Sequence, residues 1–87
     1  MNISIEYCTQ WGYLDRALSL REELENEFRN KFDVFKVELI KGTGGVFEIV
    51  VNENLQVFSK KELNRFPNSS YEVIKTIRDA VDERRLG

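Results

Sequence analysis

The chain contains one cysteine, Cys8, in the stretch YCTQWGY at residues 7–13. An apolar alternating run ends here, and a helix-like pattern begins. A thiolate is a nucleophile that exchanges with disulfides, whereas a thiol is not. The start of a helix offers unpaired backbone N–H groups and the positive end of the helix dipole, both of which favour the thiolate. A one-cysteine redox site is therefore one hypothesis, and a small buried cysteine without chemistry is the other.

Trp11 occupies the position three residues after Cys8, where a dithiol motif would carry its second sulfur. A dithiol reductant forms a mixed disulfide with one sulfur and resolves it with the other. With no second sulfur on the chain, a mixed disulfide at Cys8 would have to be released by an outside thiol. We expect the indole of Trp11 to pack against neighbouring side chains rather than to form a platform for a ligand.

The composition excludes several other functions. One cysteine and no histidine make an internal disulfide impossible and a transition-metal site improbable. The net charge is −2 and the charges are interspersed, so the basic stripe of a nucleic-acid-binding protein is missing. The 87 residues include no apolar run of membrane-spanning length and no secretion signal. We expect a single domain spanning residues 1–87, located in the cytoplasm, with no cofactor.

Periodicity predicts the elements that hold Cys8. Residues 2–7 alternate as a strand, with Ile3, Ile5 and Tyr7 on one face. Residues 11–31 have helical spacing, and the expected ion pairs on the charged side are Glu25–Arg29 and Glu27–Lys31. The expected buried stripe of this helix consists of Leu14, Ala17, Leu18, Leu24 and Phe28.

Three further strands and a second helix are predicted in the rest of the chain. Residues 34–40 form a strand, a glycine-rich turn follows, and residues 46–51 are apolar enough to be central in a sheet. Residues 55–59 return from a hairpin at 52–54, and residues 60–68 are predicted to be a polar loop. Ser69 and Glu72 have the spacing of a capping box. The stripe of the last helix consists of Val73, Ile74, Ile77, Ala80 and Val81.

This β-α-β-β-β-α order predicts an α+β, thioredoxin-like fold, with a four-stranded mixed sheet and two helices. Parallel first and second strands would end at the same sheet edge, which brings Cys8 together with the turn at 42–45. The returning fourth strand would add Ser59, Lys60 and Lys61 to this edge, and the segment with Pro67 and Ser69 also starts there. The sequence therefore predicts a thiol, a glycine-rich turn and two lysines in one region.

The glycine-rich turn KGTGG has a functional and a structural interpretation. Its backbone donors and acceptors, free of side-chain bulk, would suit a bound peptide or a glutathione-like backbone. A plain turn between strands is the alternative. The turn lacks the lysine and the spacing of a phosphate-binding loop. Lys60 and Lys61 are likewise either partner-binding groups or ordinary charges on an edge.

Several of these stretches together resemble the selenoprotein W-related (Rdx) family of thioredoxin-like proteins. The matching stretches are IEYC followed by GY at 12–13, YCTQ at 7–10, KGTGGVFEIVVN at 41–52, SKK at 59–61 and FP at 66–67. Family members carry Cys-x-x-Cys or Cys-x-x-selenocysteine after the first strand. By position, Cys8 matches the first cysteine and Trp11 the second cysteine or selenocysteine. The codons of these three amino acids differ only at the third base, so one base change accounts for the difference.

The resemblance implies a thiol-redox protein that acts through Cys8 and forms a mixed disulfide with glutathione or a protein thiol. The oligomeric state would be a monomer, or a weak dimer through an unpaired edge strand. The alternative is a redox-inactive binding module, with Trp11, Tyr13 and the FP segment as its contact patch. The residues expected to bind the partner are Thr9, Gln10, Thr43, Gly44, Gly45, Val46 and Lys60.

Overall fold

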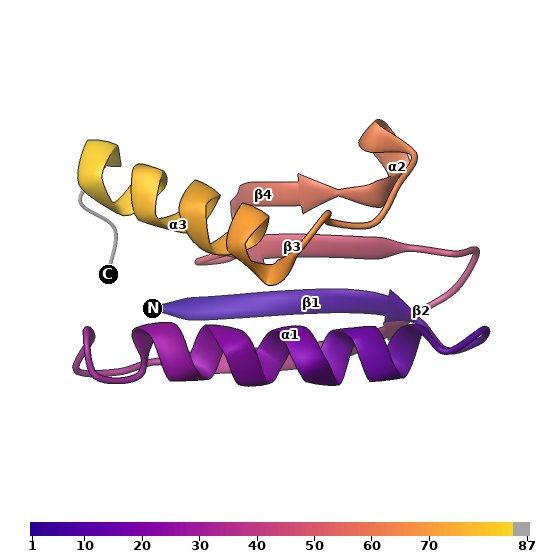
Figure 1. Ribbon diagram of the computed structural model, residues 1–87, viewed down its shortest axis with the longest axis horizontal. Helices are drawn as coiled ribbons and strands as arrows, with labels where there is room; N and C mark the ends of the chain where they lie inside the picture. The colour runs from indigo at the N-terminus through magenta and orange to yellow at the C-terminus, as the bar shows by residue number, and fades with distance from the viewer. Residues whose placement is uncertain (85–87) are drawn as a thin grey trace.

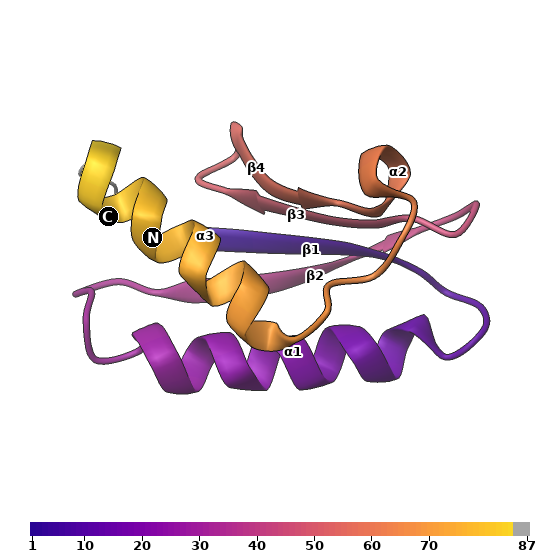
Figure 2. The same cartoon turned by 45° about the horizontal axis from the view of Figure 1, so that its top comes forward.

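Four strands form one mixed sheet, and two long helices cover one of its faces (Figures 1 and 2). The computed structural model describes residues 1–84. The strands lie in the order β2-β1-β3-β4. The elements are β1 (Asn2–Cys8), α1 (Tyr13–Phe28), β2 (Lys36–Gly42), β3 (Phe47–Val51), β4 (Leu55–Ser59), α2 (Lys60–Leu63) and α3 (Ser70–Arg84).

The strand directions confirm the predicted topology. β1 and β2 are parallel and joined through α1, β3 runs antiparallel to β1, and β4 runs antiparallel to β3 with an irregularity between Ile49 and Val50. Cys8 and Gly42 are register partners at the ends of the parallel pair. The carboxyl ends of β1 and β2 therefore share the edge that the sequence predicts.

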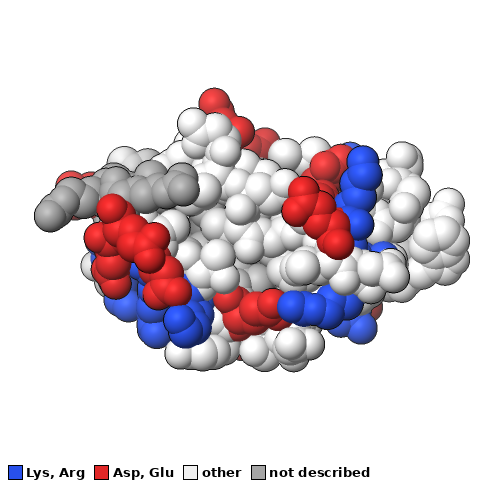
Figure 3. All heavy atoms as spheres, turned by 90° about the horizontal axis from the view of Figure 1, so that it is seen from above, with Lys and Arg blue, Asp and Glu red and all other residues white. Residues whose placement is uncertain are grey.

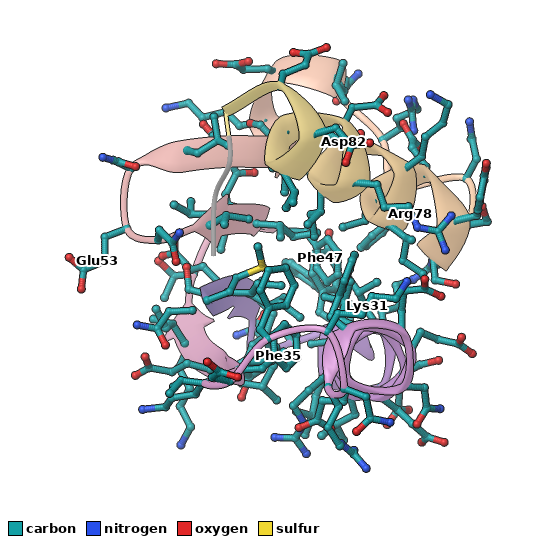
Figure 4. The ribbon with its side chains drawn as sticks, turned by 90° about the vertical axis from the view of Figure 1, so that its left-hand side faces the viewer. Lys31, Phe35, Phe47, Glu53, Arg78 and Asp82 are labelled. Carbon is teal, nitrogen blue, oxygen red and sulfur yellow. The ribbon has the colours of Figure 1, made fainter. Side chains whose placement is uncertain are left out.

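The core lies between the sheet and the helices α1 and α3. Ile3, Ile5 and Tyr7 of β1 alternate into it, and Phe47 of β3 lies in the same interior layer (Figure 4). The predicted stripe of α3 is confirmed: four of its residues are buried and Val81 is partly buried. In Figure 4, Glu53 points outward from the turn between β3 and β4, away from this core.

The buried stripe of α1 differs from the predicted one. Its buried residues are Ala17, Leu20, Leu24 and Phe28. Leu14 and Leu18 are 42% and 38% exposed, so their assignment to the core was wrong. Leu18 lies about 100° around the helix from Ala17, which turns it away from the sheet. Of the two predicted ion pairs, Glu27–Lys31 forms at 2.9 Å, while Glu25–Arg29 is not an ion pair in the described part of the chain.

Both ends of α1 are shorter than the sequence predicts. The helix begins at Tyr13 rather than Trp11, because Trp11 and Gly12 adopt left-handed backbone conformations with φ of 58° and 75°. It ends at Phe28 rather than at residue 31. Residues 9–12, here called the motif loop, therefore separate Cys8 from the first helical residue.

The segment predicted as a polar loop contains the short helix α2. The side chain of Ser59 accepts a hydrogen bond from the N–H of Glu62 at 3.1 Å, and Asn64 ends the helix in the left-handed conformation. Ser59 and Glu62 have the Ser-x-x-Glu spacing of a helix start, a signal that the charged composition of this stretch obscured.

The N-terminal end of α3 is held by Glu72, but not through the predicted box with Ser69. The Glu72 carboxylate accepts a hydrogen bond from the backbone N–H of Asn68 at 2.8 Å. It also accepts two hydrogen bonds from Arg65, at 3.0 and 2.7 Å. These bonds, above all those from Arg65, hold the pKa of Glu72 below its ordinary value. The carboxylate thus fixes the segment before α3.

Candidate functional site

The predicted site residues gather at one end of the sheet. Figures 1 and 2 both place the motif loop, the connection from β2 to β3 and α2 at this end. The connection, residues 42–46, is called the glycine turn below. The backbone N–H of Cys8 donates to the carbonyl of Val46 at 2.9 Å, which ties the glycine turn to β1. The structure thus brings Cys8, the glycine turn and Lys60 to the expected edge.

Cys8 is a free cysteine and is buried, with 2% of the residue exposed. Of the two hypotheses for Cys8, the redox site requires a thiol that solvent can reach, and the structure does not meet this requirement. Cys8 is nevertheless not part of the continuous core cluster that contains Tyr7. Because side chains alternate along a strand, the Cys8 side chain points to the opposite face from Tyr7, away from α1 and α3.

The two ends of the glycine turn flank the end of β1. A Cβ atom on Gly42 would lie 2.6 Å from Cγ2 of Val46 and 2.9 Å from Oε2 of Glu6. The side chains of Val46 and Glu6 therefore occupy the space that a side chain at position 42 would need, and they would have to move to admit one. Gly42, as the register partner of Cys8, and Val46, as the acceptor of its N–H, place the glycine turn next to the buried thiol.

Trp11 lies on the surface of the molecule. It is 76% exposed, so the expectation that its indole packs against the fold was wrong. Its ring centroid lies 6.4 Å from that of Tyr13, and its backbone is left-handed. Thr9 and Gln10 are also exposed. The motif has two sulfur or selenium positions, of which position 8 is buried and position 11 is exposed. Trp11 therefore stands at the more accessible of the two.

The exposed part of the glycine turn offers backbone rather than side chains. Gly44 and Gly45 have φ of 72° and 77°, a conformation that glycine adopts without strain. Thr43 and Gly44 are exposed, and Gly45 and Val46 are partly buried. The turn can therefore present main-chain groups to a bound molecule, as the sequence predicts, while the carbonyl of Val46 accepts the N–H of Cys8.

Two rings and a lysine flank the turn. The rings of Tyr13 and Phe66 meet edge to face at 4.9 Å, and Phe66 also contacts Phe47 at 5.3 Å. The ammonium of Lys60 lies 5.7 Å from the Tyr13 ring centroid and 5.5 Å from that of Phe66. The guanidinium of Arg16 lies 4.0 Å from the Phe66 centroid. Sequence reasoning missed Arg16. The signal that could have found it is its spacing from Gly12, because four residues are about one turn of α1.

The junction between β4 and α2 positions Lys60. Glu48 accepts hydrogen bonds from the hydroxyl of Ser59 at 2.6 Å and from the backbone N–H of Lys61 at 3.2 Å. Burial raises the pKa of Glu48, but these hydrogen bonds outweigh it and leave the pKa below its ordinary value. The backbone of Lys61 thus serves as an anchor, and the side chain of Lys60 is the one that reaches the glycine turn.

A cleft of about 410 Å³ opens beside this cluster, between α1 and the segment before α3. Phe47 and Phe66 belong to its lining, and Arg16 lies at its side. Pro67 and Ser69, which the sequence assigned to the Cys8 edge, line this cleft. In Figure 3, which shows the molecule from above, acidic and basic groups lie next to one another in a few clusters around a central area whose visible atoms belong to uncharged residues.

The fold and the site together define a thioredoxin-like α+β protein with a redox-motif position at the end of its first strand. The chain belongs to the Rdx, or selenoprotein W-related, family, whose model matches residues 2–79. This membership is consistent with a redox type of protein. No curated protein matches the chain. No helix within residues 1–84 is long and apolar enough to cross a membrane.

Two solved structures are similar to the chain over most of their length. A protein from Bordetella parapertussis is 33% identical, with a TM-score of 0.79, and the match covers 90% of this chain and 94% of that one. A selenoprotein W-related protein from Vibrio cholerae is 30% identical, with a TM-score of 0.78, covering 92% and 95% of the two chains. The thioredoxin-like fold is therefore shared by this chain and its structural neighbours.

Proposed function

We propose that this protein carries out thiol exchange through Cys8, in the cytoplasm, with glutathione or a protein thiol as its partner. The observation that carries the proposal is the position of Cys8, which is at the end of β1 and outside the core cluster. A cysteine held inside the helical layer would become accessible only on unfolding. Cys8 is flanked by the two ends of the glycine turn, and movement of that turn would make the thiol accessible.

The exchange balances without a further oxidant. The Cys8 thiolate attacks one sulfur of a disulfide, a new sulfur–sulfur bond forms at Cys8, and the partner's other sulfur leaves as a thiolate. At this step the departing partner sulfur is reduced to a thiolate and the Cys8 sulfur is oxidised to the disulfide level, while the partner's other sulfur stays at that level in the mixed disulfide. A second thiol from outside the chain then attacks the mixed disulfide and returns Cys8 to its reduced form.

Incubation with oxidised glutathione at neutral pH tests the proposal, with intact mass as the readout. We expect a single adduct of one glutathione on the folded protein, and none on Cys8→Ser. A folded protein that stays unmodified, while the same protein in denaturant is fully modified, would refute thiol exchange. As a control, circular dichroism before and after the incubation checks that the protein stays folded.

The exposure of Trp11 favours a second candidate function, a binding module that has kept the fold without redox turnover. An indole that is 76% exposed on a left-handed loop is available for contact with a partner. Tyr13 and the segment at 66–67 would extend the contact, as the sequence suggests. The two candidates are separated by Cys8→Ser, which would abolish thiol exchange but leave binding through Trp11 unchanged.

A further inference from the structure

Lys60 has no acidic partner in the described part of the chain. Lys31 and Lys75, by contrast, form ion pairs with Glu27 and Asp79 at 2.9 and 3.0 Å. The Lys60 side chain is not free in solvent, because it is partly buried and its ammonium lies within 6 Å of two aromatic rings. Cation–π contacts of this kind hold the charge in place but leave the three N–H donors of the ammonium unused.

A second donor converges on the same point. A Cβ atom placed on Gly45 would lie 3.4 Å from the hydroxyl oxygen of Tyr13 and 4.0 Å from the ammonium nitrogen of Lys60. The space that a side chain would fill at position 45 is therefore bordered by a phenol O–H and an ammonium. The hydroxyl of Tyr13 makes no hydrogen bond within residues 1–84 in this structure, so it is free to donate.

We propose that Lys60 and Tyr13 bind a carboxylate of the partner peptide in the space above Gly45. One carboxylate oxygen would accept from the ammonium and the other from the phenol, so that a single negative charge meets a single positive one. The proposal deepens the proposed thiol exchange, on which its biological meaning rests, because it names a chemical feature of the partner. The binding step itself does not use the sulfur of Cys8.

The space above Gly45, called the recess below, lies close to Cys8 along the chain of the glycine turn. This position would give a bound carboxylate a role in exchange. Gly45 precedes Val46, whose carbonyl accepts the N–H of Cys8 and whose side chain lies above Gly42, the register partner of Cys8. A peptide held by its carboxylate above Gly45 lies on the segment that must move before Cys8 can react. Specificity for a partner that carries a carboxylate would therefore be determined next to the sulfur of Cys8.

Titration of the isotope-labelled protein with S-methylglutathione, followed by NMR, tests the site. This probe has two carboxylates and no free thiol, so it measures binding without exchange. We expect the amide signals of Gly44, Gly45 and Val46 to shift. Lys60→Met, which keeps an apolar stem, should weaken binding by roughly tenfold. Tyr13→Phe should weaken it by about three- to tenfold.

Three controls separate the site from general electrostatics. Lys61→Met removes the same charge from the neighbouring residue and should leave the affinity unchanged. The diethyl ester of S-methylglutathione lacks the negative charges and should not shift the amide signals of the glycine turn. Cys8→Ser should bind the probe as the wild type does. Equal affinities of Lys60→Met and Lys61→Met, or shifts confined to other parts of the protein, would overturn the proposal.

The two proposals fail in different ways. If oxidised glutathione does not modify Cys8 but S-methylglutathione still binds in a Lys60-dependent way, thiol exchange is refuted and the carboxylate site stands. If Cys8 reacts equally fast in the wild type and in Lys60→Met, and S-methylglutathione shifts no signal of the glycine turn, the carboxylate site is refuted alone.

Discussion

Replacing Trp11 with cysteine should create a thiol that reacts far faster than Cys8. Position 11 is 76% exposed, whereas Cys8 is 2% exposed. To react, Cys8 must become accessible, and in the proposed exchange the glycine turn moves and breaks the hydrogen bond from the Cys8 N–H to Val46. That loss costs about 1 kcal/mol. Exposing part of the Val46 side chain and the thiol adds about 1–2 kcal/mol.

These costs set the size of the expected effect. An opening free energy of about 2–3 kcal/mol means that the open form is populated at roughly one part in 30 to one part in 150. The new thiol needs no such opening. We therefore expect Trp11→Cys to react with a small aromatic disulfide about 30 to 150 times faster than the wild type, under native conditions at neutral pH.

The measurement is the pseudo-first-order rate of thiol modification, followed by absorbance. Trp11→Cys combined with Cys8→Ser isolates the new sulfur, and Trp11→Ala tests whether the indole itself covers Cys8. If Trp11→Ala alone accelerates Cys8 by the full factor, the glycine turn is not the cover. If wild-type Cys8 reacts as fast as the new thiol, the reasoning from burial is refuted.

Three further predictions test the packing and the charges around the site. Leu20→Ala should lower the free energy of unfolding by about 2–5 kcal/mol, whereas Leu18→Ala should lower it by less than about 1 kcal/mol; equal losses in urea unfolding would contradict the buried stripe of α1. Ser59→Ala should cost about 1 kcal/mol and lower the melting temperature by roughly 4–8 °C, since it removes the N-cap of α2; an unchanged calorimetric transition would rule out that role. Since the folded state lowers the pKa of Glu72, its contribution to stability is complete above the ordinary glutamate pKa of about 4.3 and is lost as the pH falls through the lowered value. Glu72→Gln should therefore destabilise the protein at pH 7 but much less at pH 2, and an equal loss at both pH values would show that the charge is irrelevant.

The sequence was sufficient for the topology because the strands carry clear alternation. Ile3, Ile5 and Tyr7 identify the buried face of β1, and the apolar run in β3 marks an inner strand. Strand directions then place Cys8 and Gly42 at one edge without any knowledge of side-chain packing. Such inferences depend only on the period of two and on chain connectivity, which a single sequence displays directly.

The environment of each motif residue could not be obtained in this way. Alternation assigns Cys8 to the face opposite Tyr7, and that face of an antiparallel or mixed sheet is often open to solvent. Here Cys8 is buried, and the side chains of Val46 and Glu6 lie above its register partner Gly42, an arrangement that depends on how the glycine turn folds back. Similarly, the exposure of Trp11 follows from left-handed backbone at residues 11 and 12, whereas aromatic residues are usually expected to pack.

The different exposures of positions 8 and 11 change what the loss of the second sulfur means. If Cys8 were the exposed sulfur, Trp11 would have replaced a resolving group, and attack on a disulfide would remain fast. Because position 11 is the exposed one, Trp11 occupies the place from which a sulfur could attack directly, and the remaining sulfur is the covered one. In the proposed exchange, Cys8 would then react only after the glycine turn moves, and a partner that binds this turn would control the rate. The proposed carboxylate site above Gly45 lies on that turn, so recognition of the partner and access to the sulfur would depend on the same few residues.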